Sequence, residues 1–283
     1  MSKTLLAMIV DIVRWEEKIL LKAAEIMGLN LSLVNLRSRF ISLTEPPGNA
    51  KVYLIRAVSR TTAVTSALVI ESFGAVTINS PRALQATGDK AAMIALLASR
   101  GVPVPRSYLA LGKETALMAA EALGFPVVLK PVSGGWGMLS AKAGSPEELE
   151  QLLELKEAIP SPTSRLHVIQ EYIEAGGSDY RVLVVGGEAV AAMKRSAVRG
   201  WKANVSRGAL VEPISPRGEI EELAVRASEA LGAEVAGVDI IDGDGDMRVL
   251  EVNGVPEFRG LREATGVPVE RYILSYAREN ARR

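Results

Sequence analysis

The sequence of 283 residues contains no cysteine and a single histidine, His167. Without cysteine the chain forms no disulfide, zinc-cysteine site, iron-sulfur cluster or thiol nucleophile. One histidine also excludes metal sites that need several imidazoles. Because His167 lies in the apolar segment 166–169, we expect a buried structural histidine rather than a general base. No Ser-His-Asp or Cys-His arrangement is therefore available.

The chain also lacks an excess of charge and a long apolar run. Its 33 Lys and Arg residues balance 33 Asp and Glu residues, which argues against nucleic-acid binding through global charge. The apolar run near the N-terminus, at residues 4–10, is far shorter than the roughly 20 residues of a membrane helix. No signal peptide or anchor is visible. We expect a cytoplasmic protein that binds neither membrane nor nucleic acid.

The composition is that of a globular protein, because 48% of the residues are hydrophobic and 23% are charged. In the first part of the chain, strand-like and helical patterns alternate, which predicts a parallel sheet with helices on its faces. Turn residues at 79–89 then precede a helix over 90–99. The expected strands of the first part are 4–10, 31–35, 52–55 and 75–79, and its helices are 16–28 and 62–73.

The rest of the chain mixes helices and strands in a less regular order. Helices are expected over 114–123, 146–157, 218–231 and from about residue 268. Strands are expected over 126–131, 138–143, 167–173, 181–185, 188–194, 236–241 and 247–252.

A glycine-rich segment follows a strand that carries a lysine. The strand reads Val127-Val-Leu-Lys130-Pro, and the segment reads Ser133-Gly-Gly-Trp-Gly137. Backbone N–H groups of such a loop bind phosphate oxygens, and the lysine supplies a cation. It is not a Walker loop, because no Gly-Lys-Ser/Thr follows. A flexible hairpin without a ligand is the alternative.

Oxygen-bearing side chains interrupt two apolar strands near the C-terminus. Asp239 lies on one strand, and Glu251 and Asn253 lie two apart on the next. Since side chains alternate along a strand, the three share a sheet face and offer the hard ligands that Mg²⁺ prefers. Carboxylates held in structural salt bridges are the alternative. The segment 242–246 between them lacks the turn glycine and final glutamate of a calcium loop, which indicates a hairpin turn.

Five cations and no carboxylate lie between residues 194 and 207. Such a stretch predicts an anionic ligand, whether a triphosphate, a carboxylate substrate or nucleic acid, and a solvated surface is the alternative. The five are Lys194, Arg195, Arg199, Lys202 and Arg207. Together with the glycine-rich loop and the oxygen ligands, they indicate chemistry based on cations, Mg²⁺ and positioning, as in phosphoryl transfer.

In this order the motifs resemble those of ATP-grasp ligases of the RimK-like branch, and in particular its LysX/ArgX members. The resemblance covers nearly the whole chain. It rests on Thr87-Gly-Asp-Lys90, Leu129-Lys130-Pro, Gly134-Gly-Trp-Gly137, Gln170-Glu-Tyr-Ile173, Asp179-Tyr-Arg181, Lys194-Arg195-Ser, Asn204-Val-Ser-Arg-Gly208, Val238-Asp239, Glu251-Val-Asn253 and Glu257-Phe258.

The resemblance implies an α/β ATP-grasp fold in three parts. These are an N-terminal parallel α/β domain at 1–84, a central α+β subdomain with the glycine-rich lid loop at 85–170, and a C-terminal α+β subdomain with an antiparallel sheet and the Mg²⁺ site at 171–283. The implied cofactors are ATP and two Mg²⁺ ions, with Mn²⁺ as a substitute.

The resemblance also assigns residues to the nucleotide and the metal. The implied ATP-binding residues are Lys90, Lys130, Ser133, Gly134, Gly135, Trp136, Gly137, Gln170, Glu171, Tyr172, Ile173, Asp179, Arg181 and Asn204. The implied Mg²⁺ ligands are Asp239, Glu251 and Asn253.

For the second substrate, the resemblance implies contacts from Arg195, Val205, Ser206, Glu257, Phe258, Arg259, Gly260 and Leu261, with Arg195 and Lys130 as catalytic residues. The family loop commonly reads Gly-Ser-Trp-Gly, whereas Gly135 replaces the serine here. The segment 253–257 lies where members that select glutamate or 2-aminoadipate differ, and both substrates remain open.

The expected reaction is ATP-dependent ligation of glutamate or 2-aminoadipate, through an acyl phosphate, to the C-terminal glutamate of a small acidic amino-group carrier protein in lysine or arginine biosynthesis. Related ligases form homodimers or homotetramers, so a homo-oligomer is expected. The alternatives are a RimK-type glutamate ligase acting on a ribosomal protein or a coenzyme, a non-catalytic ATP-binding module, and a nucleic-acid binder that uses the cationic stretch.

Overall fold

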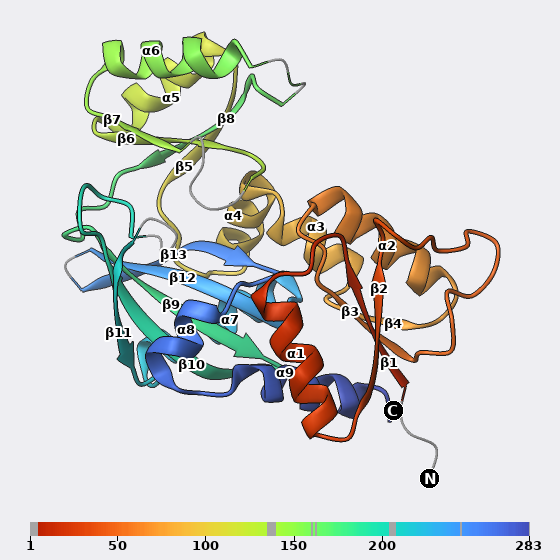
Figure 1. Ribbon diagram of the computed structural model, residues 1–283. Coiled ribbons are helices and arrows are strands. Elements are labelled where there is room, and N and C mark those ends of the chain that lie inside the picture. Colours follow the sequence, from red (N-terminus) through yellow and green to blue (C-terminus); the bar gives the residue numbers. More distant parts are fainter. Residues whose placement is uncertain are drawn as a thin grey trace.

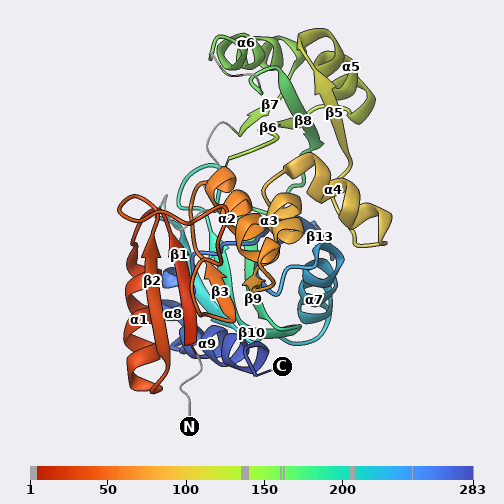
Figure 2. The ribbon, with the colours of Figure 1, turned by 90° about the vertical axis from the view of Figure 1, so that its right-hand side faces the viewer.

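The structure is a computed structural model that describes residues 5–134, 140–159, 161, 163–203, 208–243 and 245–282. It contains three β-sheets, and each is formed by a separate stretch of the chain. One sheet, with its two covering helices, lies apart from the other two at the top of Figure 1. Both ends of the described chain lie on the opposite side of the molecule (Figure 2).

The first sheet is parallel, with strand order β2-β1-β3-β4. Side chains of β1 alternate between two covering layers: Leu6 and Met8 pack toward α1, whereas Ala7 and Ile9 pack toward α2. This confirms the predicted parallel sheet. Its elements are β1 (Leu5–Val10), α1 (Trp15–Ile26), β2 (Asn30–Asn35), β3 (Val52–Ile55), α2 (Arg60–Ser72), β4 (Val76–Ile78) and α3 (Pro81–Thr87).

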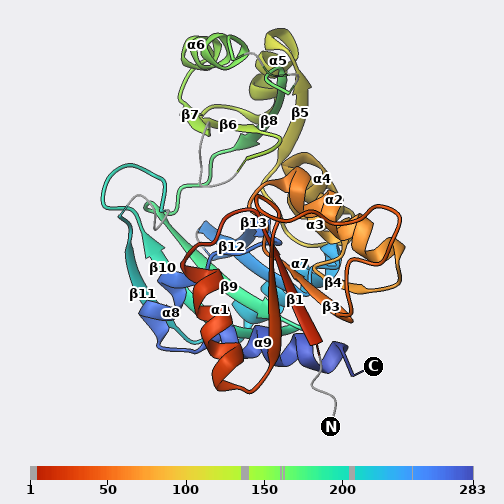
Figure 3. The same cartoon turned by 45° about the vertical axis from the view of Figure 1, so that its right-hand side comes forward.

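The second sheet is antiparallel, with order β5-β8-β6-β7, and α5 and α6 cover one of its faces (Figure 3). The helix α4 (Lys90–Ser99) leads into it from the first domain. Asp89 caps this helix by accepting hydrogen bonds from the N–H groups of Ala91 and Ala92. The elements of this sheet are β5 (Ser107–Leu111), α5 (Lys113–Leu123), β6 (Val127–Pro131), β7 (Ala141–Ala143), α6 (Pro146–Glu157) and β8 (Leu166–Glu171).

The third sheet is also antiparallel, with order β11-β10-β9-β12-β13. One face packs on α4 and α7, and the other packs on α8 and α9, which also contact α1 and the first sheet. A continuous core therefore joins the first and third sheets. The elements here are β9 (Ser178–Val185), β10 (Glu188–Ser196), β11 (Leu210–Ile214), α7 (Glu219–Leu231), β12 (Val235–Gly243), β13 (Asp246–Asn253), α8 (Arg259–Thr265) and α9 (Val269–Asn280).

Four elements were not expected from the sequence: α3, β5, β11 and α8. At Ser80 and Pro81, the turn interpretation was wrong, because Ser80 caps a helix and Pro81 occupies its first turn. The expected strand at 138–143 is described only as β7, since residues 138 and 139 lie outside the described residues.

His167 is fully buried, as predicted, and its ring nitrogens lie 3.1 Å from Lys156 Nζ and 3.2 Å from Glu157 Oε1. Burial lowers the pKa of His167, which keeps the ring neutral in the folded protein. Segment 242–246 is the turn of the β12–β13 hairpin, with Gly245 N–H donating to Asp242, although residue 244 is not described. No helix in the described ranges is both long and apolar enough to cross a bilayer.

Candidate active site

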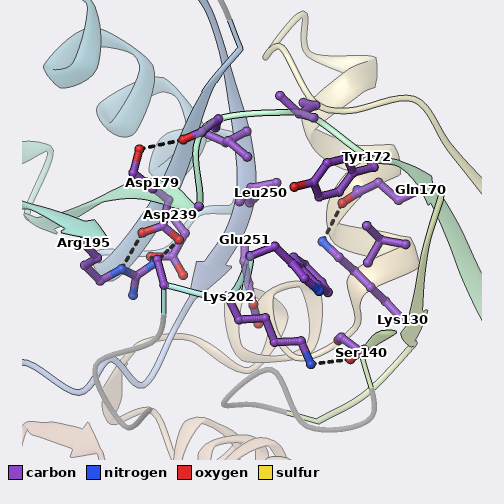
Figure 4. A pocket seen from close by; sticks show the side chains of 18 of the residues that line it. Lys130, Ser140, Gln170, Tyr172, Asp179, Arg195, Lys202, Asp239, Leu250 and Glu251 are labelled. Carbon is purple, nitrogen blue, oxygen red and sulfur yellow. Dashed lines mark hydrogen bonds and ion pairs between the residues drawn. The ribbon is translucent and has the colours of Figure 1, made fainter. Parts of the chain in front are cut away.

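Two cavities lie where the three sheets approach one another. The first, of about 110 Å³, is bounded by β6, β8, β10 and β13, and the second, of about 450 Å³, extends from there to the start of α2. Residues common to both walls are Lys90, Gly134, Asp239 and Glu251. The first cavity is drawn in Figure 4.

Most of the described residues expected at the active site line these cavities. The first cavity is lined by Lys90, Lys130, Gly134, Gln170, Glu171, Tyr172, Ile173, Asp179, Arg195, Asp239 and Glu251. The second is lined by Lys90, Ser133, Gly134, Arg181, Asp239, Glu251, Asn253 and Glu257.

Four residues expected to contact the second substrate are not on either wall. Phe258 and Leu261 are buried in the core beside α1 and α9, Arg259 pairs with Glu263 on α8, and Gly260 lies between them on the same helix. The expected residues Gly135, Trp136, Gly137, Asn204, Val205 and Ser206 lie outside the described residues.

Lys130 is held inside the first cavity by a neighbouring strand. Val128 of β6 pairs with Gln170 of β8, so Lys130 lies diagonal to Gln170 on one sheet face. The Lys130 ammonium donates to Gln170 Oε1 over 2.5 Å (Figure 4). Burial lowers the pKa of Lys130 to about 8; Glu251 opposes the shift, whereas Lys90 adds to it. An anion bound in this cavity would favour the charged form of Lys130 and raise that pKa.

The end of β8 is fixed by two arginines that bind Glu171. Glu171 accepts hydrogen bonds from Arg106 Nε at 2.7 Å and from Arg248 Nη1 at 2.5 Å. Tyr172 follows with its ring under the Lys142 ammonium, 3.6 Å from the ring centroid, and edge-on to Trp201. The glutamate thus braces the strand end, and the two perpendicular rings contribute apolar surface to the cavity wall.

A chain of ion pairs crosses three adjacent strands of the third sheet. Arg181 on β9 stands opposite Asp239 on β12, and Asp179 stands opposite Arg195 on β10. Arg195 donates to Asp179 at 2.6 and 2.8 Å and reaches Asp239 at 3.0 Å. Arg181 also binds both oxygens of Asp239. Burial alone would raise the pKa of Asp239, but the two arginines outweigh it and lower that pKa.

This network corrects one expectation from the sequence. Arg195 was grouped with cations that lack a carboxylate partner nearby in the chain, but Asp179 and Asp239 reach it across the sheet. Arg195 is only 3% exposed, and its charge is paired with these two carboxylates. Lys202, from the same stretch, donates to the Ser140 carbonyl and so joins the two segments that flank the first cavity (Figure 4).

Lys90 lies at the start of α4 and connects the central part to the third sheet. Its ammonium donates to the Gly134 carbonyl at 2.6 Å and lies 3.2 Å from Glu251 Oε1. Its backbone N–H donates to the Val132 carbonyl at 2.7 Å. Lys90 therefore links Gly134 to the carboxylate of β13.

The three oxygen donors fit a hard divalent cation. Asp239 lies opposite Glu251 in the β12–β13 pairing, Asn253 follows on the same strand, and all three line the second cavity. A carboxylate has about four lone-pair sites, and arginines occupy three on Asp239. Within the described residues no group of three or more Asp, Glu or His side chains could hold a metal, and the third donor of this set is the Asn253 amide.

Two arginines of the first domain were missed by the sequence analysis. Arg14 and Arg60 line the second cavity from the start of α1 and of α2. Nothing in the local pattern marks them, because an arginine at a helix N-terminus is an ordinary solvated residue until the fold places it opposite another domain. Only the approach of the first sheet to the third brings them to Glu251 and Asn253.

Comparisons with known proteins identify the family. Residues 87–277 match the RimK-like ATP-grasp domain, and residues 6–86 match the LysX preATP-grasp domain. Two relatives come from Sulfurisphaera tokodaii. A glutamate–LysW ligase ArgX is 34% identical over 96% of this chain and 98% of its own, and an alpha-aminoadipate–LysW ligase LysX is 30% identical over 95% and 96%.

A similar solved structure is the RimK domain ATP-grasp protein from Sphaerobacter thermophilus. Its TM-score is 0.78 at 23% identity, over 96% of this chain and 98% of that one. This likeness confirms the expected fold. The family match over more than half of the chain shows that the protein belongs to the RimK-like ATP-grasp family of ATP-dependent ligases.

Proposed function

We propose that this protein is an ATP-dependent ligase that joins glutamate or 2-aminoadipate to the C-terminal glutamate of a small acidic amino-group carrier protein. Similarity to both the ArgX and the LysX ligase over nearly the whole chain supports this. The observation that carries the proposal is that the two cavities adjoin. Both are lined by the same lysine, the same two carboxylates and Gly134 of the glycine-rich segment. A nucleotide in the first cavity would thus adjoin acid substrates in the second.

The reaction has two steps that balance. A carboxylate oxygen of the acceptor attacks the γ-phosphorus of ATP, the bond from that phosphorus to the β,γ-bridging oxygen breaks, and ADP leaves. The amine of glutamate or 2-aminoadipate then attacks the acyl carbon, and the carbon–oxygen bond breaks to release phosphate and a proton. The products are an amide, ADP and phosphate.

The residues of the first cavity bind and orient the nucleotide. Tyr172 and Ile173 form the wall for the base, with Gln170 beside them, and Lys130 and Lys90 offset phosphate charge. Ser133, Gly134, Gly135, Trp136, Gly137 and Asn204 complete the phosphate contacts in this proposal. A lysine with a pKa near 8 gains more from an arriving polyanion than one already neutralised.

Asp239, Glu251 and Asn253 would hold divalent cations, two Mg²⁺ ions with Mn²⁺ as a substitute. Bound there, the metal neutralises charge on the phosphoryl group in transfer. The guanidinium of Arg195 is fixed by Asp179 and Asp239 and so lies beside the proposed metal site. There it stabilises charge on the acyl phosphate. Arg195, Val205, Ser206 and Glu257 would contact the second substrate.

The proposal includes a cytoplasmic homo-oligomer that binds neither nucleic acid nor membrane. The balanced charge supports the absence of a nucleic-acid partner.

The acyl phosphate is tested by isotope transfer. An acceptor peptide that ends in glutamate is labelled with ¹⁸O in its carboxylates and incubated with enzyme, Mg-ATP and glutamate. One ¹⁸O atom is expected in the released phosphate, because the attacking oxygen stays on phosphorus when the amide forms. Phosphate free of label would contradict this route. The Glu251→Gln variant serves as the control, and near-full ligation by it at saturating Mg²⁺ would show that the metal site is wrongly assigned.

A further inference from the structure

The second cavity contains an arginine whose guanidinium is barely engaged. Arg60 is the first residue of α2, and its one ion pair is to Asp89 Oδ2 at 3.7 Å. Over the ranges that the structure describes, its side chain donates no hydrogen bond. The other cations on that wall have close carboxylate partners: Arg14 with Glu17, Arg181 with Asp239 and Lys90 with Glu251.

The pair with Asp89 is weak for geometric reasons. Both side chains are partly exposed, at 38% and 29%, and 3.7 Å is beyond hydrogen-bond distance. The other carboxylate oxygen of Asp89 is already used to cap α4. Arg60 therefore retains most of its donor capacity.

Gly88 leaves space for the side chain of Arg60. A Cβ atom on Gly88 would lie 2.6 Å from Arg60 Cδ and 2.9 Å from its Cγ and Nε. The φ angle of Gly88 is −86°, which any residue adopts, so the backbone conformation does not require glycine here. A Cβ atom at this position would instead force the Arg60 side chain to shift. Gly88 and Arg60 thus form a fitted pair at the mouth of the second cavity.

The surroundings of Arg60 favour a negatively charged group. The first turn of α2 carries no acidic residue, but Asp11 accepts hydrogen bonds from the N–H groups of Val58 and Ser59 just before the helix and offsets part of the positive end of its dipole. Asn253 and Glu251, which would hold the metal, line the same cavity from the opposite side. A carboxylate between Arg60 and that site would lie beside the transferred phosphoryl group.

We propose that Arg60, held in place by Gly88, binds a carboxylate of an acid substrate in the second cavity. This rests on the proposed function and deepens it. The planar guanidinium suits a carboxylate because two parallel N–H donors meet two oxygens. Two sources share this chemistry: the incoming dicarboxylic amino acid and the glutamate at the end of the acceptor.

The test is steady-state kinetics of Arg60→Gln, Arg60→Lys and Gly88→Ala, with Arg82→Gln as the matched control. Arg82 is an exposed arginine on the neighbouring helix α3 and lines neither cavity. Loss of the charge-assisted hydrogen bonds is expected to raise the KM of one acid substrate ~10-fold or more. The values of kcat and of the KM for ATP are expected to stay within about threefold.

The pattern of KM values shows which acid substrate binds at Arg60 and whether the proposal holds. A rise for glutamate or 2-aminoadipate alone places the amino acid at Arg60, and a rise for the acceptor peptide alone places the acceptor there. Arg60→Lys is expected to recover part of the loss, and Gly88→Ala is expected to imitate Arg60→Gln because it displaces the stem. Unchanged KM values for both acids, or an equal rise for ATP, would overturn the proposal.

Binding of glutarate, measured by calorimetry with Mg²⁺ and a non-hydrolysable ATP analogue, separates this proposal from the ligase assignment. Tighter binding by the wild type than by Arg60→Gln, ~10-fold or more, supports the carboxylate site even if no acceptor is ligated. Equal binding, or no binding to the wild type, refutes it. Absence of ligation together with tight glutarate binding would overturn the proposed function alone.

Discussion

Replacing Glu17 by glutamine is expected to destabilise the contact between the first domain and the segment 256–259. Glu17 is fully buried and accepts a hydrogen bond from Arg56 Nε at 3.0 Å. Arg56 is also buried, donates to the Pro256 carbonyl at 3.0 Å, and already has one terminal nitrogen, Nη2, without a hydrogen bond in the described structure. Removing the carboxylate leaves the guanidinium charge buried without its counter-ion.

The magnitude follows from this loss. Removing one partner of a buried ion pair costs about 3–5 kcal/mol. At roughly 2 °C per kcal/mol for a chain of this size, the melting temperature is expected to fall by about 6–10 °C. The double variant Glu17→Gln/Arg56→Met removes both charges and is expected to recover more than half of the loss. Glu150→Gln, which breaks an exposed pair with Lys113, is the control and should leave the melting temperature unchanged.

The pKa of Glu17 determines how the contribution of this ion pair to stability changes with pH. Burial alone would raise the pKa of Glu17, but Arg56 and Arg14 outweigh it and lower that pKa. The pair therefore stabilises the protein above the usual glutamate pKa, and its contribution is lost as the pH falls through the lowered value. Differential scanning calorimetry of both variants from neutral to acidic pH measures this. A Glu17→Gln variant that melts within 1 °C of the wild type, or a double variant less stable than the single one, would refute the reasoning.

Other ionisable groups supply further tests. Because burial lowers the pKa of Lys130 to about 8, the affinity of the free enzyme for Mg-ATP is expected to weaken between pH 7 and pH 9 more in the wild type than in Lys130→Arg; equal pH profiles in calorimetry would contradict this. Burial lowers the pKa of His167, so stability is expected to fall as the pH drops through the unfolded value of about 6.5, and His167→Gln should reduce that fall in thermal melts. If the two proteins lose stability equally, His167 is not held neutral. Asp179→Asn removes the bidentate partner of Arg195 and is expected to lower kcat ~10-fold or more with little change in the KM for ATP; an unchanged kcat would exclude a positioning role.

Much of the fold could be predicted because hydrophobic periodicity and caps lie in the local sequence. The expected bounds of α4 and α6 match the structure, since Asp89 and Ser145 mark where each helix begins. Of the missed elements, α3 carries such signals at Ser80 and Pro81, which were interpreted as a turn, whereas β11 and α8 lack them. β11 is an edge strand with Pro213 inside it, and α8 has seven residues and no side-chain cap.

The residues of the active site also fall into those that could be predicted from the sequence and those that could not. The strand position of Asp239 could be read from the sequence, because alternation along a strand fixes the face on which a side chain lies, whereas Asp179 and Arg181 were expected only from the family resemblance. Their pairing could not be predicted, since it depends on the register of β9 with β12. Arg60 gave no signal because its environment is made by the approach of Gly88 and of the third sheet.

The central claim is tested most directly by the intact mass of the acceptor. The protein is incubated with Mg-ATP and a carrier protein or peptide that ends in glutamate, with glutamate in one tube and 2-aminoadipate in another. ADP release together with a mass gain of one condensed amino acid is the predicted result, and the tube in which it occurs faster identifies the preferred substrate. ATP binding without ADP release in either tube would contradict the account.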